Sequence, residues 1–314
     1  MDAIGGYFEL ELRHGEHFHK NAIRLNSGQN CFEYILRARK YSKVYLPYYT
    51  CQVMFNTAKR CGVEIAYYHI NEQLEPEHLP QLRIGEAFLY TNYFGLKQNC
   101  VKRLAGHCGK QLIVDNAQAF YAERINGIDT FYSPRKFFGV PDGGYLYTDV
   151  QLDAEFPEAQ SMQRMTHLLK RIESGAEAGY EDYQRDEETL DGSPIEHMSK
   201  LTDALLRNID YNGVAERRTA NYRLLDEQFG STNLIHLPLN EEAVPMVYPY
   251  WTGDPTLRKR LIEQKVFVAI YWPNVSTDCA LESILKSNVF PLPVDQRCTI
   301  VDYHRIISCI SGQY

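Results

Sequence analysis

Alternation of strand-like and helix-like segments over residues 31–115 limits this chain to a small set of folds. Short apolar segments rich in β-branched and aromatic residues alternate with segments whose apolar residues recur at helical spacing. The expected strands are 43–47, 63–70, 87–92 and 111–115, and the expected helices are 31–38, 52–60 and 98–108. Strands joined through helices pair in parallel, so the sequence predicts an α/β fold with three layers: a mostly parallel sheet covered by helices on both faces.

Ligands of such sheets bind beyond the carboxyl ends of the strands. Pro47, Thr91 and Asp115 are at these predicted strand ends. We therefore expect a binding site where these three positions meet.

The whole chain is predicted to have three parts. Residues 1–22 are predicted to be an N-terminal arm, and residues 23–195 a large domain that is helical over 151–173. Residues 174–194 are acidic and poor in aliphatic side chains, which predicts a mobile loop, either a substrate lid or a solvated linker. Residues 196–314 are predicted to hold a long linking helix (198–229) and a small α/β domain. That domain is expected to contain strands 245–249 and 267–271 and helices 256–264 and 298–310.

Charge and composition exclude several classes of function. The formal net charge is −7, which argues against a general nucleic-acid binder or a protein that binds anionic membranes. No window reaches the roughly 18 apolar residues of a membrane span, and the first residues do not have the pattern of a secretory signal. The eight cysteines form no C-x-x-C pair, so we expect reduced thiols and a cytoplasmic location.

Three histidines near the N-terminus, His14, His17 and His19, are close enough in sequence to suggest a metal site. No acidic or cysteine partner keeps regular spacing with them. A surface arm at a subunit contact is the favoured interpretation, and we expect no metal ligands here.

The most informative stretch is 112–149, which carries Asp115 at a strand end, then Gln118 and Lys136, and a Gly143-Gly144 pair. Pyridoxal phosphate (PLP) needs a lysine for a Schiff base and a carboxylate beside the pyridine nitrogen. Its phosphate needs amides or hydroxyls at a helix entrance, and Ser27 with the glycine after it begins a predicted helix. Each residue also has an ordinary explanation: a surface lysine, an aspartate capping a helix, a tight glycine turn.

The order of motifs over roughly residues 23–310 resembles the DegT-type sugar aminotransferases, a branch of the fold type I PLP enzymes. The similar segments are Asn26-Ser27-Gly28 (family Gly-Ser-Gly), Leu46-Pro47-Tyr48-Tyr49-Thr50 (Val-Pro-x-x-Thr), Tyr93-Phe94-Gly95 (Leu-Tyr-Gly), Val114-Asp115-Asn116-Ala117-Gln118-Ala119 (Glu-Asp-Ala-Ala-Gln-Ala), Ser133-Pro134-Arg135-Lys136 with Gly143-Gly144 (Pro-Thr-Lys with Gly-Gly), and Met198-Ser199-Lys200-Leu201 (Met-Ser-Glu-Leu).

By this resemblance, Lys136 is the Schiff-base lysine, Asp115 the partner of the pyridine nitrogen and Gln118 a contact of the ring. Ser27 and the amides near Gly28 and Gln29 hold the phosphate. The implied reaction moves an amino group, usually from glutamate, onto a nucleotide-linked keto-deoxysugar. The family also implies a homodimer with shared active sites.

The chain departs from the family at three positions. Phe131 stands where the family has a phosphate-binding serine, so Ser133 or Thr130 is expected to replace it. Cys51 occupies the place of the aromatic residue that stacks on the ring. Ile195 replaces the asparagine that a second subunit usually contributes.

These departures leave open an alternative function: a catalytically degenerate relative that binds PLP or sugar as a regulatory or scaffold protein. A sugar dehydratase of the same family would carry a histidine in place of the lysine, so Lys136 argues against that reaction.

Overall fold

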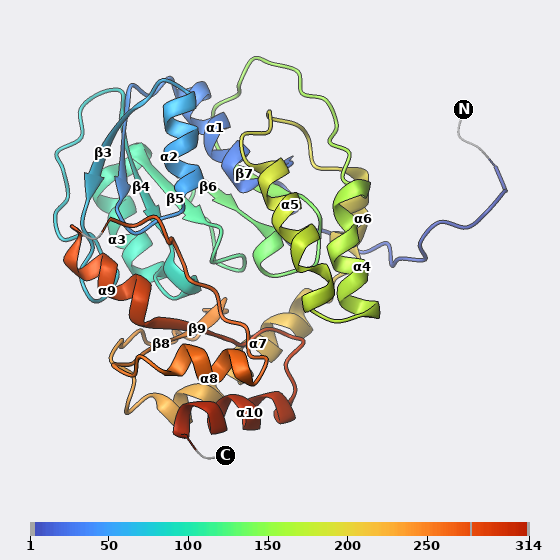
Figure 1. Ribbon diagram of the computed structural model, residues 1–314. Coiled ribbons are helices and arrows are strands. Elements are labelled where there is room, and N and C mark those ends of the chain that lie inside the picture. Colours follow the sequence, from blue (N-terminus) through green and yellow to red (C-terminus); the bar gives the residue numbers. More distant parts are fainter. Residues whose placement is uncertain (1–3, 277, 313–314) are drawn as a thin grey trace.

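A seven-stranded, mostly parallel sheet forms the centre of the large domain in the computed structural model, which describes residues 4–276 and 278–312 (Figure 1). The strand order is β1-β7-β6-β5-β4-β2-β3, and only β7 runs against its neighbours. The strands are β1 (Ile23–Leu25), β2 (Lys43–Pro47), β3 (Glu64–Tyr68), β4 (Glu86–Thr91), β5 (Leu112–Asn116), β6 (Asp129–Tyr132) and β7 (Gly144–Tyr147). The predicted parallel α/β sheet is therefore confirmed.

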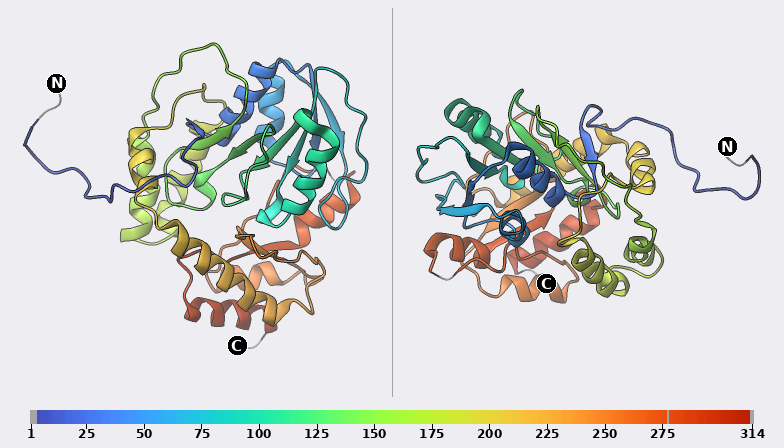
Figure 2. Two further views of the ribbon diagram at one scale, coloured as in Figure 1. Left: turned by 180° about the vertical axis from the view of Figure 1, so that it is seen from behind. Right: turned by 90° about the horizontal axis from the view of Figure 1, so that it is seen from above.

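Helices cover both faces of this sheet because successive strand residues point to opposite sides. On β4, Ala87 and Leu89 belong to the core beneath α1 (Gly28–Arg39) and α2 (Gln52–Arg60). Phe88 and Tyr90 belong to the core on the other face, where α3 (Gln98–Cys108) packs. The view from behind shows α3 in front of the sheet, on the side opposite α2 (Figure 2).

The small domain continues the core on the α3 face. It contains a two-stranded antiparallel sheet of β8 (Val247–Trp251) and β9 (Val289–Pro293). Three helices pack around it: α8 (Leu257–Glu263), α9 (Ala280–Asn288) and α10 (Ile300–Ser311). The long helix α7 (Tyr211–Phe229) leads into this domain, and its buried Arg218 donates hydrogen bonds to the carbonyls of Met246 (2.9 Å) and Phe137 (3.3 Å). These bonds join the small domain to the sheet domain.

The acidic segment 174–194 is not the loop that the sequence predicted. It contains α5 (Tyr180–Leu190), which packs against α4 (Thr166–Glu173). Ion pairs rather than an apolar stripe hold α5: Asp182 pairs with Lys170 at 2.5 Å, and Asp186 with His167 at 2.8 Å. Because charge pairing leaves no hydrophobic period, the sequence pattern gave no sign of a helix.

The long helix expected over 198–229, with a bend near Asn212-Gly213, is interrupted a few residues earlier. The segment forms α6 (Lys200–Arg207) and α7, separated where Asp210 accepts a hydrogen bond from the Gly213 amide at 3.1 Å and caps α7. The helix expected over 151–173 is shorter than predicted, since only α4 and a short 3-10 turn, Met162–Met165, are helical there.

Residues 267–271, expected to form a strand, are not part of any strand, and β9 pairs with β8 instead. The sequence did not predict β9, because it contains Pro291 and Pro293 and proline usually argues against a strand. A two-stranded sheet consists only of edge strands, which tolerate proline. The strand expected over 245–249 and the helices expected over 256–264 and 298–310 correspond to β8, α8 and α10.

The N-terminal residues 4–12 are largely exposed and extend away from the body of the molecule (Figures 1 and 2). The chain first meets the body where the Arg13 amide donates to Asn208 Oδ1 at 2.9 Å and the Gly15 amide to the Arg207 carbonyl at 3.1 Å. The ring of His17 then lies 2.6 Å from the Tyr145 hydroxyl and 2.9 Å from the Asp203 carboxylate. His19 contacts the Phe120 carbonyl at 2.8 Å. These two histidines serve separate hydrogen bonds, so the histidine run is an anchor of the arm. None of the helices within residues 4–276 and 278–312 has both the length and the apolar character that a bilayer crossing requires.

Candidate active site

A cavity of about 150 Å3 lies beyond the carboxyl ends of β2, β4, β5 and β6. The structure brings all eight residues predicted for the site to its wall: Ser27, Gly28, Gln29, Cys51, Asp115, Gln118, Ser133 and Lys136. A larger and more open cavity, about 650 Å3, is lined by residues such as Tyr34, Asp149 and His197. No lysine or arginine among the described residues lines that cavity, so the smaller one is the candidate active site.

One end of the cavity is the entrance of α1. Ser27 precedes the helix in extended conformation, and its hydroxyl accepts a hydrogen bond from the Asn30 amide at 3.2 Å. The amides of Gly28 and Gln29 belong to the first turn, where no preceding helical carbonyl is available to them. A Cβ added to Gly28 would lie 3.7 Å from Cβ of Ser133, so the serine stands directly beside these amides. Together they form an anion-binding entrance.

The position of Gly144, the second glycine of the Gly-Gly pair, leaves no room for a side chain. A Cβ at this position would lie 2.4 Å from the Ser27 carbonyl oxygen, a distance that a side chain cannot adopt. The absence of a side chain lets β7 pass directly under the turn that opens α1. The pair is therefore part of the site's frame and is more than a tight turn.

The two expected substitutes for the missing serine differ in position. Thr130 is buried and its hydroxyl donates to the Ile128 carbonyl at 3.2 Å, whereas Ser133 lines the cavity. Phe131 is fully buried, and its ring lies 6.1 Å from that of Phe32 on α1. An aromatic contact between sheet and helix thus occupies the position of the family serine.

Arg135 also lines this cavity, although no sequence motif indicated a role for it. Its side chain is 18% exposed and forms an ion pair with Glu187 of α5. Its Nε atom is buried without a hydrogen-bond partner, and burial lowers the pKa of the guanidinium. Gln29 meets the same helix, since its Nε2 donates to the Leu190 carbonyl at 2.6 Å. The last turns of α5 therefore cover the anion-binding entrance and hold a cation beside it.

The other end of the cavity carries Asp115, which is 5% exposed. Its Oδ1 accepts a hydrogen bond from the Ala117 amide at 2.8 Å, a local turn with no helix after it, so the helix-cap explanation does not hold. Burial raises the pKa of this carboxyl to about 6, although the Ala117 amide, Lys136 and Thr91 partly offset the rise. A buried carboxylate of this kind favours a cationic partner.

Gln118 is fixed by the chain around it. Its Oε1 accepts a hydrogen bond from the Phe94 amide at 2.9 Å. Phe94 has a φ of 58°, in the left-handed region that non-glycine residues rarely adopt, and it lies in the 3-10 turn Tyr93–Gly95 that follows β4. The strained turn after β4 therefore orients the glutamine after β5.

Lys136 projects from a second 3-10 turn, Pro134–Lys136. It is solvent-accessible at the cavity, and within the described part of the chain its amine forms no hydrogen bond or ion pair. The following residue is tied to the small domain, because the Phe137 carbonyl accepts from Arg218 (3.3 Å) and Gln296 (2.9 Å). The lysine is thus free at its tip and fixed at its backbone, as a nucleophilic amine requires.

Cys51 lies at the start of α2 on the cavity wall, and Trp272 from the small domain lines the same cavity. The Trp272 ring packs edge-on against Tyr49 at 4.3 Å between ring centroids, and its φ of 52° is left-handed. The structure therefore supplies an aromatic side chain near the position where Cys51 replaces the family's aromatic residue. Ile195, by contrast, is packed in the core beneath α1 and does not reach the cavity.

The sheet order and the small domain form an α/β fold that solved sugar aminotransferases share. No family model and no curated protein sequence matches the chain.

A DegT DnrJ EryC1 StrS aminotransferase from Brucella abortus superimposes with a TM-score of 0.62 at 17% identity, covering 93% of this chain and 85% of that one. DesV of S. venezuelae, solved in complex with a ketimine intermediate, gives 0.63 at 17% identity, covering 95% and 85%. The putative sugar aminotransferase Spr1654 from Streptococcus pneumoniae, in its PMP form, gives 0.66 at 12% identity, covering 93% and 87%. At these identities the likeness shows a shared fold, as the sequence resemblance predicted.

Proposed function

We propose that this protein is a PLP-dependent aminotransferase that moves an amino group from an amino acid, glutamate by our hypothesis, onto a nucleotide-linked keto-deoxysugar. The observation that carries the proposal is the convergence of Lys136, Asp115 and the entrance of α1 on one cavity at the strand ends. The fold shared with sugar aminotransferases supports the same reaction class.

The residues of the cavity fit PLP at both ends. At the α1 entrance, the amides of Gly28 and Gln29, the Ser27 and Ser133 hydroxyls and the Arg135 guanidinium would hold a phosphate. The buried Nε of Arg135, which has no hydrogen-bond partner, is a donor that an anion would satisfy. At the other end, the Asp115 carboxylate would pair with a protonated pyridine nitrogen, and Gln118 and Trp272 would border the ring.

When bound, PLP would supply a carbonyl carbon for the amine and a ring that withdraws electrons from the reacting carbon. Asp115 would keep the ring nitrogen protonated, which maintains that electron withdrawal. The Lys136 amine would hold the carbonyl carbon before the donor arrives. Once released, Lys136 Nζ would move a proton between the amine-bearing carbon of the substrate and the cofactor.

Our proposal extends to the surroundings of the enzyme. We infer a homodimer with shared active sites from the family resemblance, with the exposed N-terminal arm as a candidate contact. The eight free cysteines support a cytoplasmic location. The cover formed by α5 would exclude water from the phosphate end.

The test is a half-reaction of the full chain loaded with PLP. Glutamate, added without a sugar acceptor, should give one equivalent of 2-oxoglutarate per bound cofactor, and a Lys136→Ala variant should give none. PLP bound tightly in the wild-type protein without oxo-acid release from any amino acid would contradict the aminotransferase. That result would favour the alternative, a PLP-binding regulatory protein.

A further inference from the structure

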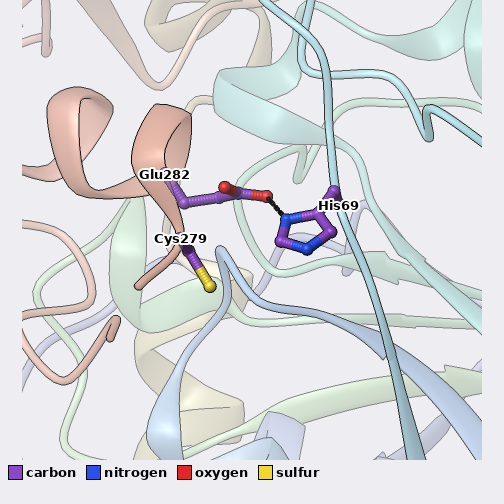
Figure 3. A group of neighbouring side chains, drawn as sticks. All are labelled: His69, Cys279 and Glu282. Carbon is purple, nitrogen blue, oxygen red and sulfur yellow. Dashed lines mark hydrogen bonds and ion pairs between the residues drawn. The ribbon is translucent and has the colours of Figure 1, made fainter. Parts of the chain in front are cut away.

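Three side chains with metal-binding donor atoms meet between the two domains, away from the wall of the candidate active site. His69 follows β3 in the large domain, and Cys279 and Glu282 lie at the beginning of α9 in the small domain (Figure 3). Their donor atoms, an imidazole nitrogen, a thiol sulfur and a carboxylate oxygen, all lie within 4.8 Å of one another. No sequence pattern indicates this group, because His69 lies about two hundred residues before the other two side chains.

Glu282 is a buried carboxylate without a permanent cation. It is 1% exposed, and its Oε1 accepts from the Ile70 amide at 3.2 Å and lies 3.0 Å from Nδ1 of His69. No lysine or arginine in the described ranges pairs with it, and Oε2 has no hydrogen bond there. An imidazole carries a charge only when protonated. A buried carboxylate is costly unless a cation compensates it, so this group is suited to a cation.

Cys279 adds a second donor without a partner. Its thiol is buried, and no hydrogen bond reaches its sulfur from any other described residue. Its sulfur, the His69 imidazole nitrogen and a Glu282 carboxylate oxygen lie within 4.8 Å of one another. A divalent cation at this point would stabilise both a thiolate and the carboxylate.

We propose that His69, Cys279 and Glu282 bind a divalent zinc ion that clamps the small domain to the large one. A mixed set of imidazole, thiolate and carboxylate ligands suits Zn²⁺, and three protein ligands leave the fourth tetrahedral position for water. On binding, the Cys279 S–H bond breaks and its proton passes to solvent as the S–Zn bond forms.

The position of the cluster gives the ion a structural role. The ring of Tyr48 packs on the His69 ring at 4.6 Å between centroids. Tyr48 begins the loop that continues through Thr50 and Cys51 to the wall of the candidate active site. An ion at His69 would therefore fix this loop relative to α9 while remaining outside the cavity.

Titration of the metal-free full chain with Zn²⁺, and with Co²⁺ as a spectroscopic probe, tests the proposal. The wild-type protein should bind one equivalent, with a thiolate-to-cobalt absorption band. Cys279→Ser should lose the band, and His69→Ala should weaken zinc binding at least about 100-fold, more than the loss of an outer-shell partner. Cys61→Ser is the matched control, since Cys61 is a free, half-buried cysteine outside the cluster, and it should bind as the wild type does.

A cobalt spectrum without a thiolate band, or equal zinc affinity of Cys279→Ser and Cys61→Ser, would overturn the zinc site and leave only an ion pair between His69 and Glu282. Thermal unfolding of the wild-type chain gives a readout that needs no variant. Zinc should raise its melting temperature, and an unchanged temperature at saturating zinc would also overturn the proposal. The result is independent of PLP binding.

Discussion

Replacement of Asp115 by asparagine should stabilise the cofactor-free protein while weakening its hold on PLP. The carboxyl is buried, and its own environment supplies only partial compensation through the Ala117 amide, Lys136 and Thr91. Asparagine keeps an oxygen that can accept the hydrogen bond from the Ala117 amide. The substitution therefore removes the buried charge and preserves the local turn.

The size of the effect follows from the pKa of the carboxyl. Burial raises the pKa from 3.8 to about 6. A difference of this size changes the free energy of unfolding by about 3 kcal/mol between a pH well below 3.8 and a pH well above 6. Because the folded protein binds the proton more tightly than the unfolded chain, the contribution of Asp115 to stability is fully present below about pH 4. It is lost as the pH rises through 6.

Urea unfolding of the two cofactor-free proteins between pH 4 and 8 measures this difference. The unfolding free energy of Asp115→Asn, relative to the wild type, should rise by about 2.5 kcal/mol over this range, with most of the rise between pH 4 and 6. Asp153→Asn, at an exposed aspartate, should show no such rise. If the difference in unfolding free energy between Asp115→Asn and the wild type did not change with pH, the reasoning would be refuted. Burial would then not disfavour the ionised form of the Asp115 carboxyl.

Three further substitutions test the phosphate end of the cavity. Arg135→Met should weaken PLP binding about tenfold to 100-fold, because it removes a charge-assisted hydrogen bond of about that free energy. The affinity is measured by competition with inorganic phosphate, and an unchanged affinity would show that Arg135 is not part of the site. Gly144→Ala should lower the free energy of unfolding in urea by about 3 kcal/mol, because the added Cβ would collide with the Ser27 carbonyl. Unaltered stability would contradict that close approach. Phe131→Ser should cost about 3–5 kcal/mol by the same measurement, because it removes the contact with Phe32; improved stability would mean that the ring is not a packing element.

The sequence predicted the parts of the site that depend on local order. Strand-end positions such as Asp115, and the Ser27 turn at the start of α1, follow from hydrophobic period and turn chemistry, and the parallel topology then brings them to one edge. The sheet and its helices on both faces were predictable for the same reason.

The remaining parts depend on contacts between distant segments. Trp272 reaches the cavity only because the small domain folds back onto the loop after β2, and its left-handed backbone leaves no pattern in the sequence. Helix α5 is held by ion pairs such as that of Asp182 with Lys170, so it has no apolar period. Arg135 became a candidate only through its burial beside α5.

The central claim is that Lys136 holds PLP in this cavity. Its most direct measurement is borohydride reduction of the PLP-treated protein, followed by peptide mass spectrometry. We predict one covalently attached cofactor per chain, located on Lys136, and none after the same treatment of Lys136→Ala. Absence of attachment in the wild-type protein, or attachment spread equally over other lysines such as Lys97 and Lys200, would contradict the account.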